Sequence, residues 1–400
     1  MTTRAEERPP GPERGSAASA VAGRPPLGFA CLWDREPERT WSSTPWALRE
    51  ALSHRLPLVD LGADPGPIVR SLLRSSAARR TSLGWKTLWR SSALTDRVVE
   101  RTLRRQVERQ RPAVALQVLD LAAMSCPYFV LRDTSWSQIL RLHDEGMSFD
   151  LLGHPGFSRQ RLAKRVEREL AILEGAAGVI ATSEWMRRGL TAEGLPFERV
   201  HVIDLGATAL PPADDDLRAA TDRRASGDRR RLLFVGRDFP RKAGDLVVAA
   251  FARVRARHPD VTLTVVGPQH WPLDGAVPDG IDFLGSLGRD QVGALYAAHD
   301  LFVMPSRFEA FGIVFVEAQS AGLPCVARDR CAMPELVIEG VSGTLQTGDD
   351  PDELAARIEA CLADDELYRR CADNVDAVRE RFSWSVAAER IERLLLPYLG

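Results

Sequence analysis

The sequence lacks several features that define large classes of protein. No run of eighteen apolar residues occurs in its 400 residues, so no segment is long enough to span a bilayer as a helix. The six cysteines form no Cys-x-x-Cys pair, and no set of metal ligands stands out. A formal net charge of −2 gives no overall attraction to nucleic acid or to a membrane. We therefore expect a reduced, cytoplasmic protein with structural thiols, no metal and no nucleic-acid partner.

A glycine motif of dinucleotide-binding enzymes is also absent. No Gly-x-Gly-x-x-Gly follows the two predicted strands that open the halves of the chain, at Pro26 to Trp33 and at Arg231 to Gly236. In a nicotinamide-dependent oxidoreductase, these glycines let the backbone approach the pyrophosphate. An oxidoreductase of that kind is therefore the least favoured enzyme class.

The length and the hydrophobic content of the chain suffice for more than one apolar core. With 44% hydrophobic residues, a chain of this length is expected to form two domains of ordinary size. We expect residues 1–26, rich in Arg, Glu, Pro, Gly and Ala, to be a disordered tail. Residues 27–207 are predicted to form the first domain and residues 231–383 the second, with alternating strands and helices as in a parallel sheet. The polar segment 208–230, which has no apolar period, is predicted to be a linker.

The clearest pattern in the second half begins at Leu301. An apolar run, Leu301 to Met304, predicts a buried parallel strand that stops at Pro305. After a loop, apolar residues at helical spacing predict a helix from Ile313 to Ala321, and another strand follows at Pro324 to Ala327. Such a unit places a ligand beyond the carboxyl end of the first strand, facing the free amides of the helix.

Two carboxylates lie where that ligand would bind. Glu309 is in the loop, and Glu317 is inside the helix. Hydroxyl groups on either side of a diphosphate could each donate a hydrogen bond to one of these carboxylates. The spacing alone is equally compatible with a capping carboxylate and a solvated one.

Matching cations occur earlier in the chain. The predicted strand Arg231 to Gly236 is followed by Arg237 and Lys242, and then by a helix from about Asp245 to Arg257. Cations on a strand-to-helix loop suit a diphosphate because each hydrogen bond is charge-assisted. The alternative is a solvated basic loop, above all for Arg241.

Together these motifs resemble the carboxyl-terminal half of a retaining glycosyltransferase of family 4, over about Leu232 to Leu395. The matching residues are Gly236-Arg237, Lys242, Pro305-Ser306, Glu309-Ala310-Phe311-Gly312 and Glu317. The resemblance implies the GT-B fold, an α/β fold of two Rossmann-like domains whose parallel sheets face across a cleft. It also implies that residues 384–400, a final helix, pack back on the first domain. The implied activity moves a sugar from a nucleoside-diphosphate sugar to a hydroxyl acceptor, with retention and without a metal.

The resemblance also implies roles for single residues. Glu309 would contact the donor sugar, and Glu317 the ribose hydroxyls. Leu287, with Gly288, would meet the nucleobase. The donor diphosphate would be held by Arg237, Lys242 and the amides around Phe311, Gly312 and Ile313. The catalytic candidates are therefore Glu309, Arg237, Lys242 and, from the first domain, Asp133.

Three departures from the family pattern leave questions open. Arg132 stands beside Asp133 where many members have a histidine, so no histidine role carries over, although His143 or His154 downstream could approach the sugar. Cys331 to Glu335 replaces a Gly-Gly-x-Pro-Glu run. Trp41 to Pro45 replaces a glycine loop and predicts either an ordinary helix capped by Thr44 or a site for a phosphate or an acceptor sugar.

Two other functions remain compatible with these departures. One is a sugar-nucleotide epimerase or hydrolase of the same fold, which needs no acceptor site. The other is a non-catalytic protein that binds nucleotide sugars.

The segment with the most unusual composition is residues 70–111. It contains twelve Lys or Arg and three acidic residues, which gives a net charge of +9. Trp85, Leu88 and Trp89 are spaced as on one helix among these cations. A basic amphipathic helix with tryptophans can lie on an anionic bilayer. The hypothesis is that residues 70–111 make peripheral contact with the inner face of a membrane or with a lipid-linked acceptor; a solvated helix face is the alternative.

Overall fold

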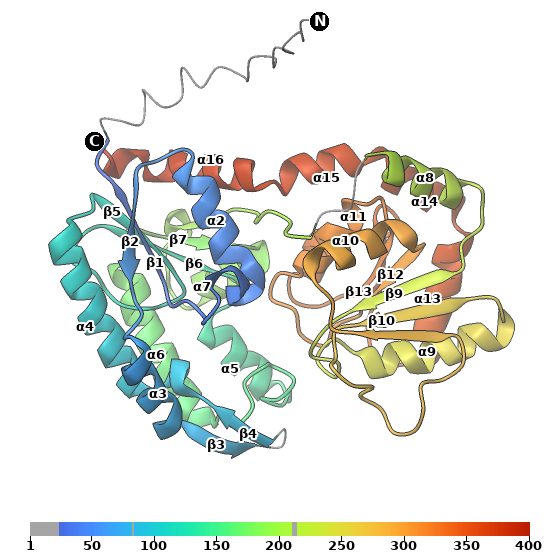
Figure 1. Cartoon of the computed structure of the whole chain (residues 1–400), viewed down its shortest axis with the longest axis horizontal. Helices are drawn as coiled ribbons and strands as arrows, with labels where there is room; N and C mark the ends of the chain where they lie inside the picture. Colours follow the sequence, from blue (N-terminus) through green and yellow to red (C-terminus); the bar gives the residue numbers. More distant parts are fainter. Residues whose placement is uncertain (1–23, 82–83, 210–213) are drawn as a thin grey trace, which may run out of the picture.

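A computed structural model describes residues 24–81, 84–209 and 214–400. These residues form two lobes that lie side by side, and the last helices of the chain pass across one end of both (Figure 1). The predicted tail, apart from residues 24–26, lies outside the described residues. Among the described residues, no helix is both long and apolar enough to cross a membrane.

The first lobe is built on a six-stranded parallel sheet in the order β2-β1-β5-β6-β7-β8. The strand predicted at Pro26 to Trp33 is confirmed as β1. The strands are β1 (Leu27–Cys31), β2 (Leu58–Gly62), β5 (Val114–Val118), β6 (Tyr128–Arg132), β7 (Gly178–Ala181) and β8 (Val200–Val202). The helices are α2 (Thr44–Ser53), α3 (Pro67–Ser76), α4 (Ala93–Gln110), α5 (Trp136–Asp144), α6 (Arg159–Gly175) and α7 (Glu184–Ala192). Phe29 and Ala30 of β1 belong to different apolar clusters, because successive side chains point to opposite, buried faces of the sheet.

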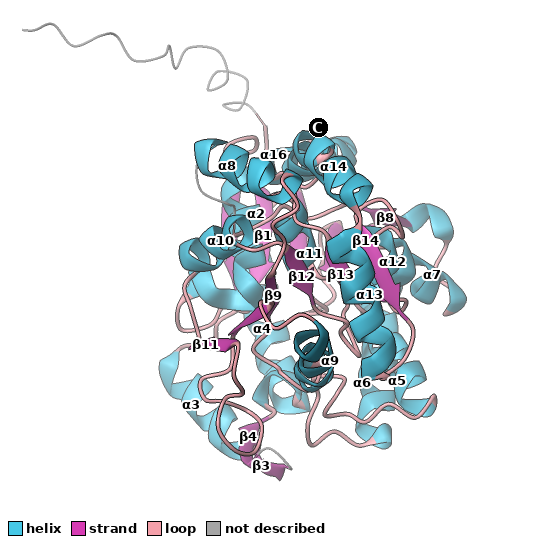
Figure 2. Cartoon of the chain, turned by 90° about the vertical axis from the view of Figure 1, so that its right-hand side faces the viewer, coloured by secondary structure: helices cyan, strands magenta, loops and turns pink. Residues whose placement is uncertain are grey.

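The second lobe repeats this plan with the strand order β11-β10-β9-β12-β13-β14, again all parallel. The strands are β9 (Arg231–Val235), β10 (Thr262–Val266), β11 (Ile281–Gly285), β12 (Leu301–Val303), β13 (Cys325–Arg328) and β14 (Gly343–Gln346). The helices are α8 (Asp214–Ala225), α9 (Gly244–Arg257), α10 (Arg289–Ala298), α11 (Ile313–Gln319), α12 (Met333–Leu336), α13 (Pro351–Ala363), α14 (Asp365–Asp373) and α15 (Val375–Arg381). Figure 2 shows α9 and α13, which pack together, on the outer side of this lobe.

Both sheets reverse their winding direction at one place. In the first sheet the reversal lies between β1 and β5, and in the second it lies between β9 and β12. Ligands of open α/β sheets bind beyond the carboxyl ends of the strands at such a reversal. The strand order therefore brings together the loops after β9 and β12, which carry the predicted cations and carboxylates.

Part of the predicted linker is helical: residues 214–225 form α8, and residues 210–213 lie outside the described part of the chain. The guanidinium of Arg224 is buried and donates hydrogen bonds to the carbonyl oxygens of Tyr296 (2.7 Å) and Ala321 (2.6 Å). Tyr296 is in the last turn of α10, whose carbonyl groups have no intrahelical partners, and Ala321 lies just after the end of α11. Contacts to neighbouring helices therefore hold α8 in place, even though its sequence has no apolar period.

The single basic helix predicted around Trp85 and Trp89 is also wrong. Two short antiparallel strands, β3 (Ala78–Thr81) and β4 (Gly84–Thr87), form a hairpin there, and Trp85 lies in β4. Trp89 comes after the hairpin and is 7% exposed in an apolar cluster of the first lobe. The two tryptophans therefore do not share a helix face.

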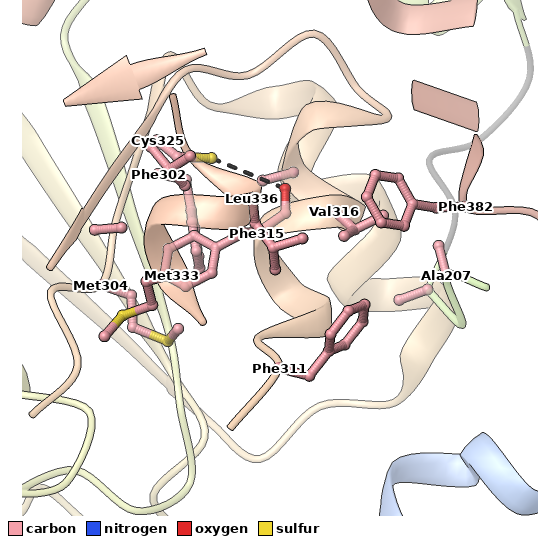
Figure 3. Close-up of a cluster of buried hydrophobic side chains, with 14 of the residues drawn as sticks. Ala207, Phe302, Met304, Phe311, Phe315, Val316, Cys325, Met333, Leu336 and Phe382 are labelled. Atoms are coloured by element: carbon pink, nitrogen blue, oxygen red, sulfur yellow. Dashed lines mark hydrogen bonds between the residues drawn. The ribbon is translucent and has the colours of Figure 1, made fainter. Parts of the chain in front are cut away.

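The carboxyl-terminal helix α16 (Trp384–Leu395) packs against α2 of the first lobe, as the resemblance implied. The indole nitrogen of Trp384 donates a hydrogen bond to the carbonyl oxygen of Ala207 (2.9 Å). The amide of Ala207 in turn donates to the carbonyl oxygen of Phe382 (2.9 Å). Figure 3 shows Ala207 and Phe382 close to α11 of the second lobe, so this corner joins both lobes.

Candidate active site

A cavity of about 1470 Å³ lies between the carboxyl ends of the two sheets. Loops after β1, β5 and β6 of the first lobe contribute to its wall, as do loops after β9, β10, β11 and β12 of the second. The sequence-predicted site residues that line it are Asp133, Arg237, Lys242, Leu287, Glu309, Gly312, Ile313 and Glu317. The structure therefore brings together all but one of the predicted side chains.

The exception is Phe311, whose side chain belongs to the core. It is 6% exposed and packs near Phe382, with 6.5 Å between ring centroids. Figure 3 shows it beside α11, close to Val316 and Ala207. Only the backbone of Phe311 is left for a ligand, and only a backbone role was implied for it.

The centre of the second-lobe wall is an ion pair between Lys242 and Glu309. Burial, together with the nearby Arg241 guanidinium, lowers the pKa of Lys242, whereas the paired carboxylate favours the charged ammonium. Gly236 makes room for this side chain, because a Cβ there would lie 2.8 Å from Cγ of Lys242. Because Gly236 has no side chain, the side chain of Lys242 can pack against the backbone at the end of β9.

Two arginines flank this pair in different states. Arg237 lines the cavity, is exposed, and forms no hydrogen bond or ion pair with the part of the chain that the structure describes. Arg241 also lines the cavity, where it is bound to Asp238 (2.9 Å) and lies 3.5 Å from the carbonyl oxygen of Phe308. The alternative of a solvated loop is therefore wrong for Arg241, whereas the guanidinium of Arg237 is free to bind an anion.

Glu317 is buried and already accepts hydrogen bonds from the protein. Its Oε1 accepts from the Thr208 hydroxyl (2.9 Å) and the Ala209 amide (2.8 Å), and its Oε2 accepts from the Tyr296 hydroxyl (3.1 Å). Burial raises the pKa of this carboxyl group, and these donors oppose that shift. A carboxylate oxygen has two acceptor sites, so Oε2 retains capacity for one more donor. No local pattern predicts the three partners, because Thr208 and Ala209 precede the second lobe and Tyr296 is on another helix.

Gly312 sets the geometry at the start of α11. Its φ of 94° lies in the left-handed region, and a Cβ there would lie 2.8 Å from the Phe315 ring and 3.1 Å from Cγ of Glu309. Any side chain at this position would displace Glu309 or Phe315. The glycine therefore holds the loop carboxylate against the helix.

The first-lobe wall rests on a buried charge network. Arg132 pairs with Asp120 and with Glu169 (2.7 Å), so its guanidinium is occupied. Arg165 extends the network through Asp120 (3.3 Å). Burial raises the pKa of Glu169 to about 7, and burial likewise raises the pKa of Asp133, which lines the cavity. The sequence did not reveal this network, because Arg165 and Glu169 look like part of an ordinary charged helix.

The loop before α2 is not an ordinary capped helix start. Trp41, Ser42 and Ser43 all have positive φ values, of 43°, 55° and 70°, and all line the cavity. Thr44 is the first residue of α2, and no side chain caps that helix. The predicted Thr44 cap is therefore wrong, because Ser43 precedes the helix in a left-handed conformation instead of the extended one that capping requires.

The segment from Cys331 to Glu335 contacts the other lobe and does not line the cavity. Both oxygens of Glu335 accept hydrogen bonds from the first amides of α7, those of Glu184 (2.7 Å) and Trp185 (2.5 Å). Cys331 has a φ of 56°, a conformation that favours glycine. The segment therefore lies outside the cavity wall, and Glu335 joins the two lobes.

These features define a GT-B architecture: two facing Rossmann-like lobes with a cavity at their reversal points. Solved structures support this fold. Sucrose-phosphate synthase from Thermosynechococcus elongatus is similar over 94% of this chain and 99% of its own, with a TM-score of 0.67 and 20% identity. WaaG, a glycosyltransferase involved in lipopolysaccharide biosynthesis, is similar over 92% of this chain and 99% of its own, with a TM-score of 0.63 and 17% identity.

Sequence comparisons find similarity mainly in the second lobe. Residues 218–377 match the family model described as glycosyl transferases group 1. A GDP-mannose-dependent α-(1-6)-phosphatidylinositol monomannoside mannosyltransferase of Mycolicibacterium smegmatis is 31% identical over 46% of this chain and 55% of its own. The α-D-kanosaminyltransferase of Streptomyces kanamyceticus is 28% identical over 68% of this chain and 73% of its own. The chain spans about half the length of most of the curated relatives it matches.

Proposed function

We propose that this protein is a retaining glycosyltransferase that moves a sugar from a nucleoside-diphosphate sugar to a hydroxyl acceptor. The observation that carries the proposal is the convergence of Arg237, Lys242 and Glu309 on one wall of a cavity between two lobes. A free guanidinium and a buried ammonium suit a diphosphate, and carboxylates suit the hydroxyl groups of a sugar and a ribose. The names of the relatives support the same chemistry.

In the proposed reaction, the bond between the anomeric carbon and the diphosphate oxygen breaks, and negative charge gathers on the leaving diphosphate. Arg237 and Lys242 stabilise that charge more in the transition state than in the ground state, which lowers the barrier. Their two positive charges let the mechanism proceed without a metal. The amides at Gly312 and Ile313 add donors on the same side.

The acceptor approaches from the first lobe. Its hydroxyl oxygen attacks the anomeric carbon on the face that the diphosphate leaves, and its proton passes to the departing phosphate oxygen. Asp133 faces the cavity from the loop after β6 and accepts a hydrogen bond from the acceptor. Arg132 takes no direct part, because Asp120 and Glu169 occupy its guanidinium.

The proposal is tested in two stages. Thermal shifts with UDP-, GDP- and ADP-sugars identify the donor, because a ligand of the folded state raises the melting temperature. Transfer is then measured with inositol 3-phosphate and simple sugars as acceptors, since several relatives are named D-inositol 3-phosphate glycosyltransferases. Nucleotide release that requires an acceptor is expected. Release without an acceptor would indicate a hydrolase or epimerase, and binding without turnover would indicate a non-catalytic protein.

We further propose that the far end of the first lobe touches an anionic membrane. Helix α3 exposes Ile68 (77%) and Leu72 (66%). It lies beside the β3–β4 hairpin at the end of the lobe away from α16, in both views (Figures 1 and 2). Residues 70–111 carry a net charge of +9, and cations near an anionic surface contribute about 1 kcal/mol each. Apolar side chains beside such cations suit a lipid headgroup region.

A further inference from the structure

His154 lies in the cavity wall, on the segment between α5 and α6. Its ring packs against Trp136 and Phe157, with centroid distances of 4.9 Å and 5.3 Å. These aromatic neighbours fix the ring on both sides, while the residue itself lines the cavity. The imidazole is therefore held in one orientation at a surface that a ligand can reach.

The surroundings of His154 place it at one end of the cavity. Trp136 and Phe157 belong to a buried apolar cluster that also contains Phe308 and Ala310 of the second lobe. Phe308 and Ala310 flank Glu309 in the sequence. The loop of Glu309 follows β12 in the middle of the sheet, whereas Leu287 follows β11 at one edge, with β10 and β9 between the two strands. His154 is therefore near the Glu309 end, away from the proposed nucleobase end.

The ring nitrogens of His154 have no hydrogen-bond partner among residues 24–81, 84–209 and 214–400. Thr134 lines the same cavity, and its buried hydroxyl oxygen likewise has no partner in the described chain. Buried polar groups in proteins are normally hydrogen-bonded, so the Thr134 hydroxyl points to a polar ligand in the cavity, and the ring nitrogens of the half-buried His154 in the same cavity wall are free to bond to it.

The protonation state of the His154 ring indicates which chemical group of a ligand it can bind. Burial, with smaller contributions from Arg132 and Arg241, lowers the pKa of His154 to about 4. A neutral imidazole has one donor nitrogen and one acceptor nitrogen, which matches a hydroxyl group, itself both donor and acceptor. A phosphate group offers acceptors only, and the free Arg237 already provides for it.

We propose that His154 contacts a hydroxyl group of the transferred sugar, as the first lobe's contribution to sugar recognition. This inference rests on the proposed function, because it requires a nucleoside-diphosphate sugar in the cavity. In this inference His154 contacts the sugar part of the donor and makes no contact with the nucleotide part. The affinity of the protein for the nucleoside diphosphate alone should therefore be independent of this side chain.

The test compares two ligands on the same variants by calorimetry. UDP is compared with UDP-glucose, and GDP with GDP-mannose, on the wild type, His154→Ala and His154→Gln. In His154→Ala, the dissociation constant of the sugar nucleotide should rise roughly 3- to 10-fold, the usual effect of losing a neutral hydrogen bond. The constant for the nucleoside diphosphate should stay within about twofold. His154→Gln, which keeps a donor and an acceptor, should recover part of the loss.

His143→Gln is the matched control. His143 lies on the same side of the first lobe, but its ring is bonded to the carbonyl oxygen of Met147 (2.9 Å) and stacks on Phe149. It does not line the cavity, so this variant should bind both ligands as the wild type does. Equal weakening of both ligands in His154→Ala and His154→Gln would show a structural role and overturn the inference, as would no weakening at all. If the wild type binds none of the UDP-, GDP- and ADP-sugars, the proposed function itself fails.

Discussion

Lys242 and Glu309 lie 67 positions apart in the sequence, yet they form an ion pair that joins the loop after β9 to the loop after β12. Both side chains are mostly buried, with 13% and 11% of their surface exposed. Without a donor, the ammonium is neutralised by the carboxylate. In the proposed function, a diphosphate therefore shares or takes over Lys242, which links donor binding to a rearrangement of Glu309.

Single substitutions in this pair should destabilise the protein more than the double substitution does. Glu309→Gln or Lys242→Met leaves one buried charge without its partner, which costs roughly 3 kcal/mol of unfolding free energy. The double variant removes both charges, so its loss should be smaller than the sum of the single losses. Urea denaturation of the four proteins measures this difference. Strictly additive losses would show that the pair contributes no coupling.

Arg237→Met should separate catalysis from stability. We expect kcat/KM to fall by an amount equivalent to about 2 to 4 kcal/mol of transition-state stabilisation. The unfolding free energy should stay within about 0.5 kcal/mol, because Arg237 bonds to no other described residue. Arg253→Met, which removes an exposed guanidinium paired with Asp352 outside the cavity, is the control. Unchanged turnover in Arg237→Met would remove the proposed mechanism.

Glu169 should give the stability of the protein a distinctive pH dependence. Burial raises its pKa from 4.5 to about 7, so between these values the folded state holds a proton that the unfolded state has lost. The stability that this group contributes is complete below pH 4.5 and disappears as the pH rises through 7. The unfolding free energy of the wild type relative to Glu169→Gln should therefore fall by about 3 kcal/mol over that range. Denaturation at several pH values checks the sign; a rising difference would contradict it.

The membrane proposal predicts a salt-sensitive association. Wild-type protein should sediment with vesicles containing phosphatidylserine at low salt, and should be released at high salt because screening weakens the attraction. Ile68→Ser combined with Leu72→Ser should reduce sedimentation without changing activity toward water-soluble acceptors. The matched change Phe197→Ser, at a residue that is 61% exposed on the segment after α7, should have no effect. Protein that stays wholly in the supernatant at low salt would dispose of the proposal.

Most strands of the two parallel sheets were predictable because each is a short apolar run. Leu301 to Met304, which stops at Pro305, and Arg231 to Gly236 are examples. Helix α8 was not predictable, since Arg224 holds it through carbonyl oxygens of distant helices. The prediction that Trp89 shares a helix face with Trp85 failed for a similar reason. The spacing suits a helix, but the β3–β4 hairpin precedes Trp89, and Trp89 packs in the apolar core.

The candidate site was predictable as a set of residues but not as a set of contacts. Loops at the sheet reversal had to bring Arg237, Lys242 and Glu309 together, and the structure confirms that they line one cavity. The pairing of Lys242 with Glu309 depends on side-chain directions that spacing does not determine. The hydrogen bonds of Glu317 to Thr208 depend on where the first lobe ends relative to the second, which no local pattern encodes.

The side chain of Glu335, in the second lobe, accepts hydrogen bonds from the first amides of α7, in the first lobe. The protection of these amides from exchange therefore depends on how close the two lobes are. When they part, the leading amides of α7 are released to water and exchange their hydrogens freely. A molecule that draws the lobes together would slow this exchange at Glu184 and Trp185 without touching either one. Deuterium uptake at these two backbone amides therefore measures how far the two lobes are closed.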